Sequence, residues 1–293
     1  MKNIDNGLSA WKMKSNHNNM IELQSHSNEL KNDKVEIGFY GSSAFKITTP
    51  NGLTIMVDPW RNHPARGWDW YFNDFPLTKV DIGVSTHAHY DHDALHRLDS
   101  NVNLERLIGQ YEFSDVKIKG IADKHSTDGC CSLYDYKKVM REIHGVNIEP
   151  PNNPRSWDNC IIVIETAGIR IVHWGDNRSD PPEEVWEKIG KIDIALLPVD
   201  DSEHVMGFAG IDDIINRLQP KIIIPHHYYI WDIVQRQSTL LNVNKWIESR
   251  NNVKNLNCAS ISFNKSSISQ LDKQINFFGD NVMFDKKAWR ENS

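Results

Sequence analysis

The stretch IGVSTHAHYDHDALHRL, residues 82–98, decides the fold prediction. It begins with a short apolar run typical of a buried strand, continues into a histidine-rich turn, and ends in a pattern that predicts a short helix. The turn contains His87, His89, Asp91 and His92. Imidazole and carboxylate donors crowded at a strand end can converge on a metal ion, and they suit zinc, iron or manganese better than calcium or magnesium. The alternative is a solvated polar turn. This alternative is disfavoured, because the pattern H-x-H-x-D-H rarely occurs by chance in a chain of this length.

One turn cannot supply every ligand of two metal ions, so further ligands must come from elsewhere in the chain. Other strand-like runs also end in suitable side chains. His125 follows VKIKGIA, Asp176 follows GIRIVHW, and His226 and His227 follow KIIIP.

The rest of the chain predicts strands in a group and then strands alternating with helices. VEIGFY, AFKITT and LTIMVDP, between Val35 and Pro59, predict a small antiparallel meander. NCIIVIET, GIRIVHW, IDIALLPV and KIIIPHH predict further strands, whereas PEEVWEKIG and FAGIDDIINRLQ have helical spacing. This order favours an α+β fold with a mixed sheet and helices outside.

The polar segment of residues 1–34 is predicted to be a flexible leader, either mobile or loosely docked, because it has too few apolar positions to order itself independently. Residues 35–293 are then one domain, of a size that can bury a substantial core. Within it, residues 127–158 resemble an insertion with one helix near Tyr134–Ile143 and a loop rich in Pro and Asn. From Val253 onward the strand signals are weak.

Composition narrows the class of protein. The 293 residues carry a net charge of −6, so a nucleic-acid partner is not expected. The sequence has no apolar run long enough for an integral membrane segment, and its first residues lack the apolar core of a secretion signal, which predicts a cytoplasmic protein. The four cysteines lack C-x-x-C spacing and are predicted to be reduced thiols. A small-molecule substrate is expected, and a homo-oligomer is compatible with the sequence.

The ordered motifs GFYGSSAFKI, LTIMVDPW, THAHYDHDAL, IVHWGDN, LLPVD and IIPHHY resemble the metallo-β-lactamase superfamily over about residues 35–250. Within that superfamily they are most similar to the branch containing ascorbate-6-phosphate lactonase and N-acyl phosphatidylethanolamine phospholipase D. The resemblance implies an αββα sandwich with two divalent metal ions, most simply zinc, with manganese or iron as alternatives. The implied metal ligands are His87, His89, Asp91, His92, His125, Asp176 and His227.

The resemblance also distributes these ligands. His87, His89 and His125 are assigned to the first metal, the remaining members of the set to the second, and Asp176 bridges both. Two assignments stay open, because His144 is an alternative to His125 and His226 is an alternative to His227. His173 is expected to support the site rather than bind metal.

Such donors predict a catalytic site, since structural zinc sites are usually rich in thiolate. Two metal ions about 3.5–4 Å apart can hold a hydroxide between them that attacks an ester, a lactone or a phosphodiester. The resemblance to the superfamily also implies that Asp91 steers a proton. Asp58 is predicted to accept a hydrogen bond from a ligand imidazole. Its alternative role is to form the turn before Pro59.

The segment LLPVDDSEHVMG, residues 196–207, departs from the resemblance, because Asp200, Asp201 and His204 stand where the branch usually has small glycines. Acidic side chains beside the site would disfavour a highly anionic substrate. They could instead cap the following turn. His204 is a candidate general acid, since imidazole titrates near neutral pH.

The loop PWRNHPARGWDWYF contains Trp60, Trp68 and Trp70, which either wall a substrate pocket or belong to the core. His63 in this loop is expected to be a surface residue. Two other functions remain as alternatives. One is a di-iron, oxygen-dependent oxidoreductase on the same fold, and the other is a non-catalytic metal-binding interaction protein.

Overall fold

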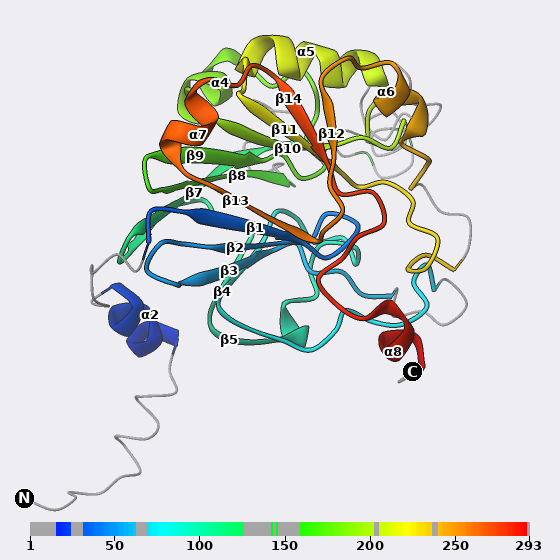
Figure 1. The fold of residues 1–293 in the computed structure, drawn as a ribbon. Coiled ribbons are helices and arrows are strands. Elements are labelled where there is room, and N and C mark those ends of the chain that lie inside the picture. The colour runs from blue at the N-terminus through cyan, green and yellow to red at the C-terminus, as the bar shows by residue number, and fades with distance from the viewer. Residues whose placement is uncertain are drawn as a thin grey trace, which may run out of the picture.

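The computed structural model describes residues 16–24, 32–62, 69–125, 159–201, 205–235 and 240–291, together with Glu142 and Gly145. These residues form two β-sheets that pack against each other, with helices on the outer side of the larger sheet (Figure 1). The predicted sandwich of mixed sheets with helices outside is therefore confirmed.

The smaller sheet has six strands in the order β13-β1-β2-β3-β4-β5. Its strands β1, β2 and β3 form the predicted antiparallel meander, and β3, β4 and β5 run parallel to one another. Because β3 and β4 are parallel neighbours, the residues that follow them meet at one edge of the sheet. The bounds are β1 (Val35–Phe39), β2 (Phe45–Thr48), β3 (Thr54–Val57), β4 (Thr78–Ser85), β5 (Leu98–Glu105) and β13 (Ser260–Phe263).

The larger sheet has eight strands in the order β12-β14-β11-β10-β9-β8-β7-β6. Its central strands β9, β10 and β11 are parallel, so their carboxyl ends also meet at one edge. The strong apolar runs of these strands are buried on both faces, as expected for parallel strands covered by helices. The bounds are β6 (Gly109–Phe113), β7 (Val116–Asp123), β8 (Asn159–Thr166), β9 (Ile169–His173), β10 (Ile194–Pro198), β11 (Ile222–His226), β12 (Val253–Asn255) and β14 (Gln274–Phe277).

The helices predicted from sequence follow the expected segments. Helix α4 (Glu183–Ile189) starts after Pro182, and α5 (Phe208–Leu218) buries one apolar face over the larger sheet (Figure 1). The short helix predicted after the histidine-rich turn is a single 3₁₀ turn, η1 (Leu95–Arg97). The remaining helices are α2 (Asn16–Gln24), α6 (Asn244–Glu248), α7 (Lys265–Ser269) and α8 (Lys286–Glu291).

Helix α2 lies within the segment predicted to be a mobile or loosely docked leader. Its residue Leu23 is buried, and the side-chain amide of Asn19 donates a hydrogen bond of 2.6 Å to the backbone carbonyl of Asn101 in β5. The helix therefore forms because an edge strand far along the sequence gives it a surface to pack on. The helix expected near Tyr134–Ile143 lies outside the described residues, apart from Glu142.

The segment from Val253 onward contributes to both sheets. Strand β13 pairs with β1, whereas β14 lies between β12 and β11. These strands have three or four residues each, too few for a periodicity to be recognised in the sequence.

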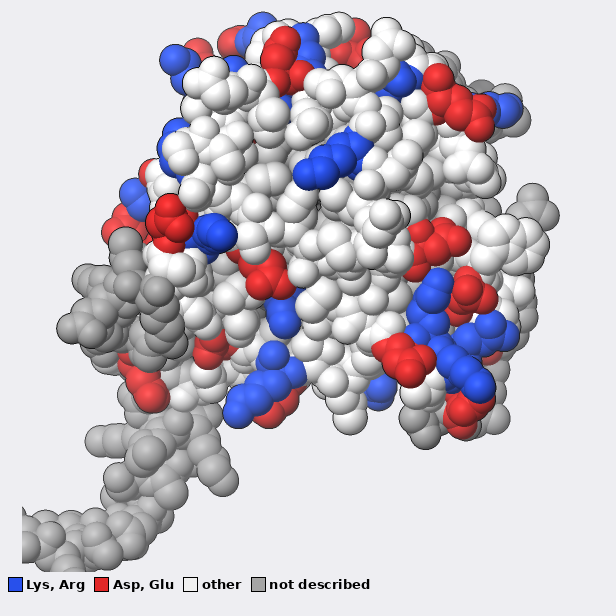
Figure 2. All heavy atoms as spheres, in the orientation of Figure 1, with Lys and Arg blue, Asp and Glu red and all other residues white. Residues whose placement is uncertain are grey.

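The core settles one of the open tryptophan assignments. Trp60 is fully buried and its ring stacks on Tyr71 at 4.2 Å between ring centroids, so it is a core residue. Among the described residues, Cys160 is buried, Cys258 is exposed, and neither forms a disulfide bond, whereas Cys130 and Cys131 lie outside the described residues. Among the described helices, none has the length and apolar character to cross a membrane. Basic and acidic side chains are interspersed on the face in Figure 2.

Candidate metal centre

The structure brings together all seven residues that the sequence predicts as metal ligands. They form two groups of side chains, and the donor atoms of each group lie within 4.8 Å of one another. Asp176 belongs to both groups. The first group is His87, His89, His125 and Asp176, and the second is Asp91, His92, Asp176 and His227.

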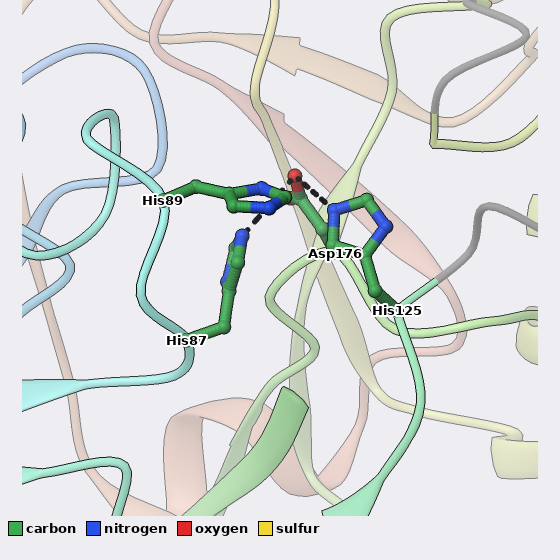
Figure 3. A group of neighbouring side chains, drawn as sticks. All are labelled: His87, His89, His125 and Asp176. Carbon is green, nitrogen blue, oxygen red and sulfur yellow. Dashed lines mark ion pairs between the residues drawn. The ribbon is translucent and has the colours of Figure 1, made fainter. Parts of the chain in front are cut away.

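The two sheets contribute to the site from opposite sides. In the first group, His87 and His89 come from the turn after β4, His125 follows β7, and Asp176 lies in the loop after β9 (Figure 3). In the second group, His227 directly follows β11. Because these elements end at the facing edges of the two sheets, residues far apart in the sequence become neighbours.

Imidazole nitrogens surround the carboxylate of Asp176. The Nε2 atom of His92 lies 3.3 Å from Oδ1, and the Nε2 atoms of His125 and His227 each lie 3.5 Å from Oδ2. That of His87 lies 3.8 Å from the same Oδ2 atom. Two ligand atoms at tetrahedral angles around zinc lie about 3.3 Å apart when each is about 2.0–2.1 Å from the metal. The spacing around Asp176 therefore fits donors that share cations better than it fits direct hydrogen bonds, which are shorter.

The buried atoms at the centre support this fit. Both carboxylate oxygens of Asp176 and the Nε2 atoms of His87 and His92 are buried and make no hydrogen bond within the described part of the chain. Buried polar atoms without a partner are costly, and a group of them gathered at one place is typical of a ligand-binding site. Imidazole and carboxylate side chains of this kind suit divalent cations such as zinc, iron and manganese.

The carboxylate of Asp58 contacts two residues of the histidine-rich turn, Thr86 and His92. This carboxylate accepts hydrogen bonds of 2.7 Å from both the backbone N–H and the hydroxyl of Thr86, and it lies 2.7 Å from Nδ1 of His92. The Thr86 hydroxyl in turn lies 3.0 Å from Nδ1 of His87. The predicted contact between Asp58 and a ligand imidazole is thus present. Asp58 has a φ of 51°, a backbone conformation that Asp tolerates better than most residues.

Asp200 has a different position from the one expected. It is fully buried, and its Oδ2 atom lies 2.8 Å from Nδ1 of His227. The sequence suggested a carboxylate that faces the substrate or caps a turn, and the structure instead places it behind an imidazole. The reason is that β10 and β11 are parallel neighbours, so the loop after each strand starts at the same edge. Asp201, the next residue, is exposed.

His125 is held at the first group by a network of polar side chains. It forms an isolated β-bridge with Asn177, whose amide donates a 2.8 Å hydrogen bond to Asp123. The guanidinium of Arg178 donates to the same carboxylate at 2.7 Å and 3.2 Å. The alternative residue His144 lies outside the described residues.

Two further histidines support the site without joining either group of described residues. The Nε2 atom of His173 lies 2.8 Å from the carbonyl of Ser43, and His226 contacts the hydroxyl of the same serine at 3.1 Å. The two rings stack, with centroids 4.7 Å apart. His173 therefore has the supporting position expected from sequence, and His226 does not take the place of His227.

Burial and the neighbouring carboxylates act in opposite directions on the pKa values of the imidazoles. Burial lowers the pKa of His87 well below its ordinary value. Burial also lowers the pKa of His92 and His227, but Asp176 and the nearby carboxylates outweigh this effect. They raise the pKa of His92 well above its ordinary value and that of His227 to about 10. In the metal-free protein these two imidazoles therefore carry protons at neutral pH.

Part of the predicted surroundings is not described. His204, His63 and Trp68 lie outside the described residues. Trp70 is half-buried and packs edge-on against Tyr90 at 5.0 Å between ring centroids, beside Asp91. Of the two described tryptophans of this loop, Trp60 and Trp70, the structure places Trp70 beside the metal-binding turn.

Known proteins resemble the chain over this region. A family model described as the beta-lactamase superfamily domain matches residues 36–227. The UPF0173 metal-dependent hydrolase of Thermodesulfovibrio yellowstonii is 28% identical over 211 residues, which cover 66% of this chain and 78% of that protein. A UPF0173 metal-dependent hydrolase of Lysinibacillus sphaericus is 28% identical over 203 residues, which cover 66% and 85%.

Solved structures show the same fold. A metallo-β-lactamase superfamily protein of Thermotoga maritima has a TM-score of 0.57 and 22% identity, over 83% of this chain and 97% of that one. The metallo hydrolase Igni18 of Ignicoccus hospitalis has a TM-score of 0.50 and 15% identity, over 85% and 96%. The predicted metallo-β-lactamase sandwich is thereby confirmed.

Proposed function

Because the chain belongs to the beta-lactamase superfamily, we propose that it is a metal-dependent hydrolase. We propose further that its substrate is an ester, a lactone or a phosphodiester. The observation that carries the proposal is the pair of donor groups that share Asp176. The name of the relatives, metal-dependent hydrolases, supports the same reaction class.

The proposed cofactors are two divalent cations, with zinc favoured by the donors. The first group offers three imidazoles and one carboxylate, and the second offers two of each. Such mixed nitrogen and oxygen sites without thiolate are typical of catalytic rather than structural zinc. When bound, a pair of cations supplies a nucleophile at neutral pH, because shared water loses a proton far more readily than bulk water.

The protein's own residues have three tasks in this proposal. His87, His89 and His125 hold one cation and the second group holds the other. Asp58 fixes the ring orientation of His92, which is the usual role of a carboxylate behind a ligand imidazole. Asp91, at 5% exposure the most accessible carboxylate of the set, is placed to bind and release a proton at the reacting centre. His204 remains a candidate general acid.

A substrate panel tests the proposal. The zinc-reconstituted protein is assayed with lactones, phosphodiesters and phospholipids, alongside Asp176→Ala and the control Asp213→Ala on the exposed face of α5. We expect one substrate class to be turned over, a loss of at least about a thousandfold for Asp176→Ala, since both cations lose a ligand, and full activity for the control. Equal activity of Asp176→Ala and the wild type would contradict the two-cation mechanism.

Metal analysis separates the proposal from its alternatives. Protein purified without oxygen that contains stoichiometric iron and consumes oxygen would indicate an oxidoreductase. Full occupancy by zinc or manganese with turnover of an ester or phosphodiester supports the hydrolase. Full occupancy without turnover of any panel member would favour a binding protein.

A further inference from the structure

Two buried carboxylates contact the imidazole rings of the second donor group at their Nδ1 atoms. Asp58 lies behind His92 at 2.7 Å, and Asp200 lies behind His227 at 2.8 Å. All four side chains are fully buried. In each pair the contact is made by Nδ1, so the imidazole donates that N–H to the carboxylate, and Nε2 is the ring atom that would bind a cation once its proton is displaced.

In the first donor group, His87 has a hydroxyl rather than a carboxylate beside its Nδ1 atom. The Nδ1 atom of His87 lies 3.0 Å from the hydroxyl of Thr86, which is a neutral group. That hydroxyl donates its own proton to Asp58, so it is free only to accept from His87. A neutral acceptor increases the basicity of an imidazole less than a carboxylate does.

The second donor group also has more carboxylates in and beside it than the first. Asp91 and Asp176 are both donors of the second group, with Asp58 and Asp200 directly behind its imidazoles. The first group has Asp176 alone as an anionic donor. Carboxylates gathered in a buried site repel one another and are stabilised by a divalent cation at their centre.

From these contacts we propose that the two cation sites are unequal and that Asp200 makes the second group the site that fills first. The inference rests on the proposed function only in requiring that both groups bind a cation. Asp200 acts as a positioning residue through His227, without touching substrate. The positive φ of His227, 58°, and the hydrogen bond of its backbone N–H to the carbonyl of Ser42 fix the backbone, and Asp200 fixes the ring.

Stepwise zinc titration of the full chain against a competing chelator tests the loading order. The variant Asp200→Asn keeps the shape of the side chain and removes its charge, and Asp201→Asn makes the same change at the exposed neighbouring position. We expect the tighter of two dissociation constants to rise 10-fold to 100-fold in Asp200→Asn while the weaker is unchanged. In Asp201→Asn both constants should equal those of the wild type.

A third variant assigns the two steps to the two groups. His89→Ala removes a donor of the first group alone, so the tighter step should persist and the weaker step should be lost. With cobalt(II), the visible absorption of the first equivalent should change in Asp200→Asn and stay the same in Asp201→Asn. This readout reports on ligand geometry, which a loss of stability alone would not move.

Two results would overturn the inference. One is loss of the tighter step in His89→Ala, which would mean that the first group fills first, and this result does not depend on whether Asp200→Asn folds. The other is a folded Asp200→Asn protein with both dissociation constants unchanged. If the wild type binds no zinc at all, the proposed function itself fails, whereas two cations bound in the reverse order contradict the loading inference alone.

Discussion

At the scale of single residues, Gly175 controls the approach of the two sheets at the metal centre. It precedes Asp176 and has a φ of 57°. A Cβ atom at this position would lie 2.8 Å from Oγ1 and 2.9 Å from Cβ of Thr86, the residue that links Asp58 to His87. We therefore expect Gly175→Ala to lower the free energy of unfolding by about 2–4 kcal/mol and to weaken zinc binding at least about tenfold. Denaturant unfolding and zinc titration measure the two effects.

Gly168, in the turn between β8 and β9, is the matched control. Its φ is 70°, but a Cβ atom there would meet nothing within 4 Å among the described residues. Gly168→Ala should therefore cost only the backbone strain, about 1–2 kcal/mol, and leave zinc affinity unchanged. If the two variants lost zinc affinity equally, crowding against Thr86 could not be the cause.

The sequence could predict those site residues that lie in a local motif. His87, His89, Asp91 and His92 are recognisable together, and Asp176 and His227 follow strongly apolar strands. The contact between Asp58 and His92 was also predictable, because an acid directly after a strand can reach the same edge. The contact of Asp200 with His227 was not, since it depends on the register between β10 and β11, which no local pattern specifies.

At the scale of elements, α5 covers the strands β10 and β11, which are followed in the sequence by Asp200 and His227 (Figure 1). Ile214 is fully buried on its inner face, whereas its neighbour Asp213 is exposed. Ile214→Ala should lower the free energy of unfolding by about 2–5 kcal/mol, because it leaves a cavity under the helix. Asp213→Ala should change it by less than about 0.5 kcal/mol. Urea unfolding of both variants tests the difference, and a mild effect at Ile214 would show that α5 packs loosely.

Elements with strong periodicity were predictable, and elements that depend on distant partners were not. The apolar spacing of α5 and the runs of β8 to β11 are visible in the sequence. The short strands β12 and β14 and the helix α2 are not, because their stability comes from pairing or packing with residues far along the chain. The pairing of β13 with β1 at the edge of the smaller sheet is likewise a long-range feature.

At the scale of the whole molecule, the proposed cations connect the two sheets. One side of the site comes from the turn after β4 in the smaller sheet, and the other comes from the ends of β7, β9 and β11 in the larger sheet. A cation held from both sides should stabilise the folded protein by about 3 kcal/mol when its free concentration is a hundred times its dissociation constant. For a chain of this size that corresponds to about 5–10 °C in the melting temperature.

Chelation measures this stabilisation. Removal of metal should lower the melting temperature of the wild type by that amount, and readdition of zinc should restore it. The variant Asp176→Ala should show a much smaller response, because both sites share the missing carboxylate. An equal response in the variant would place the stabilising cation elsewhere in the molecule.

The pH dependence of this stabilisation follows from the two imidazoles with raised pKa values. In the metal-free protein, His92 and His227 contribute stability that is fully present below the unfolded pKa of about 6.5 and is lost as pH rises toward the folded pKa, about 10 for His227. His87 has a lowered pKa, so its contribution to stability is present above about pH 6.5 and is lost as pH falls.

A cation must displace the protons of His92 and His227, and its binding therefore strengthens as pH rises. At constant buffered free zinc, we expect the difference in melting temperature between the zinc-bound and metal-free protein to grow from pH 6 to pH 8.5. A difference that is constant or falls over this range would mean that both imidazoles are already neutral before the cation binds.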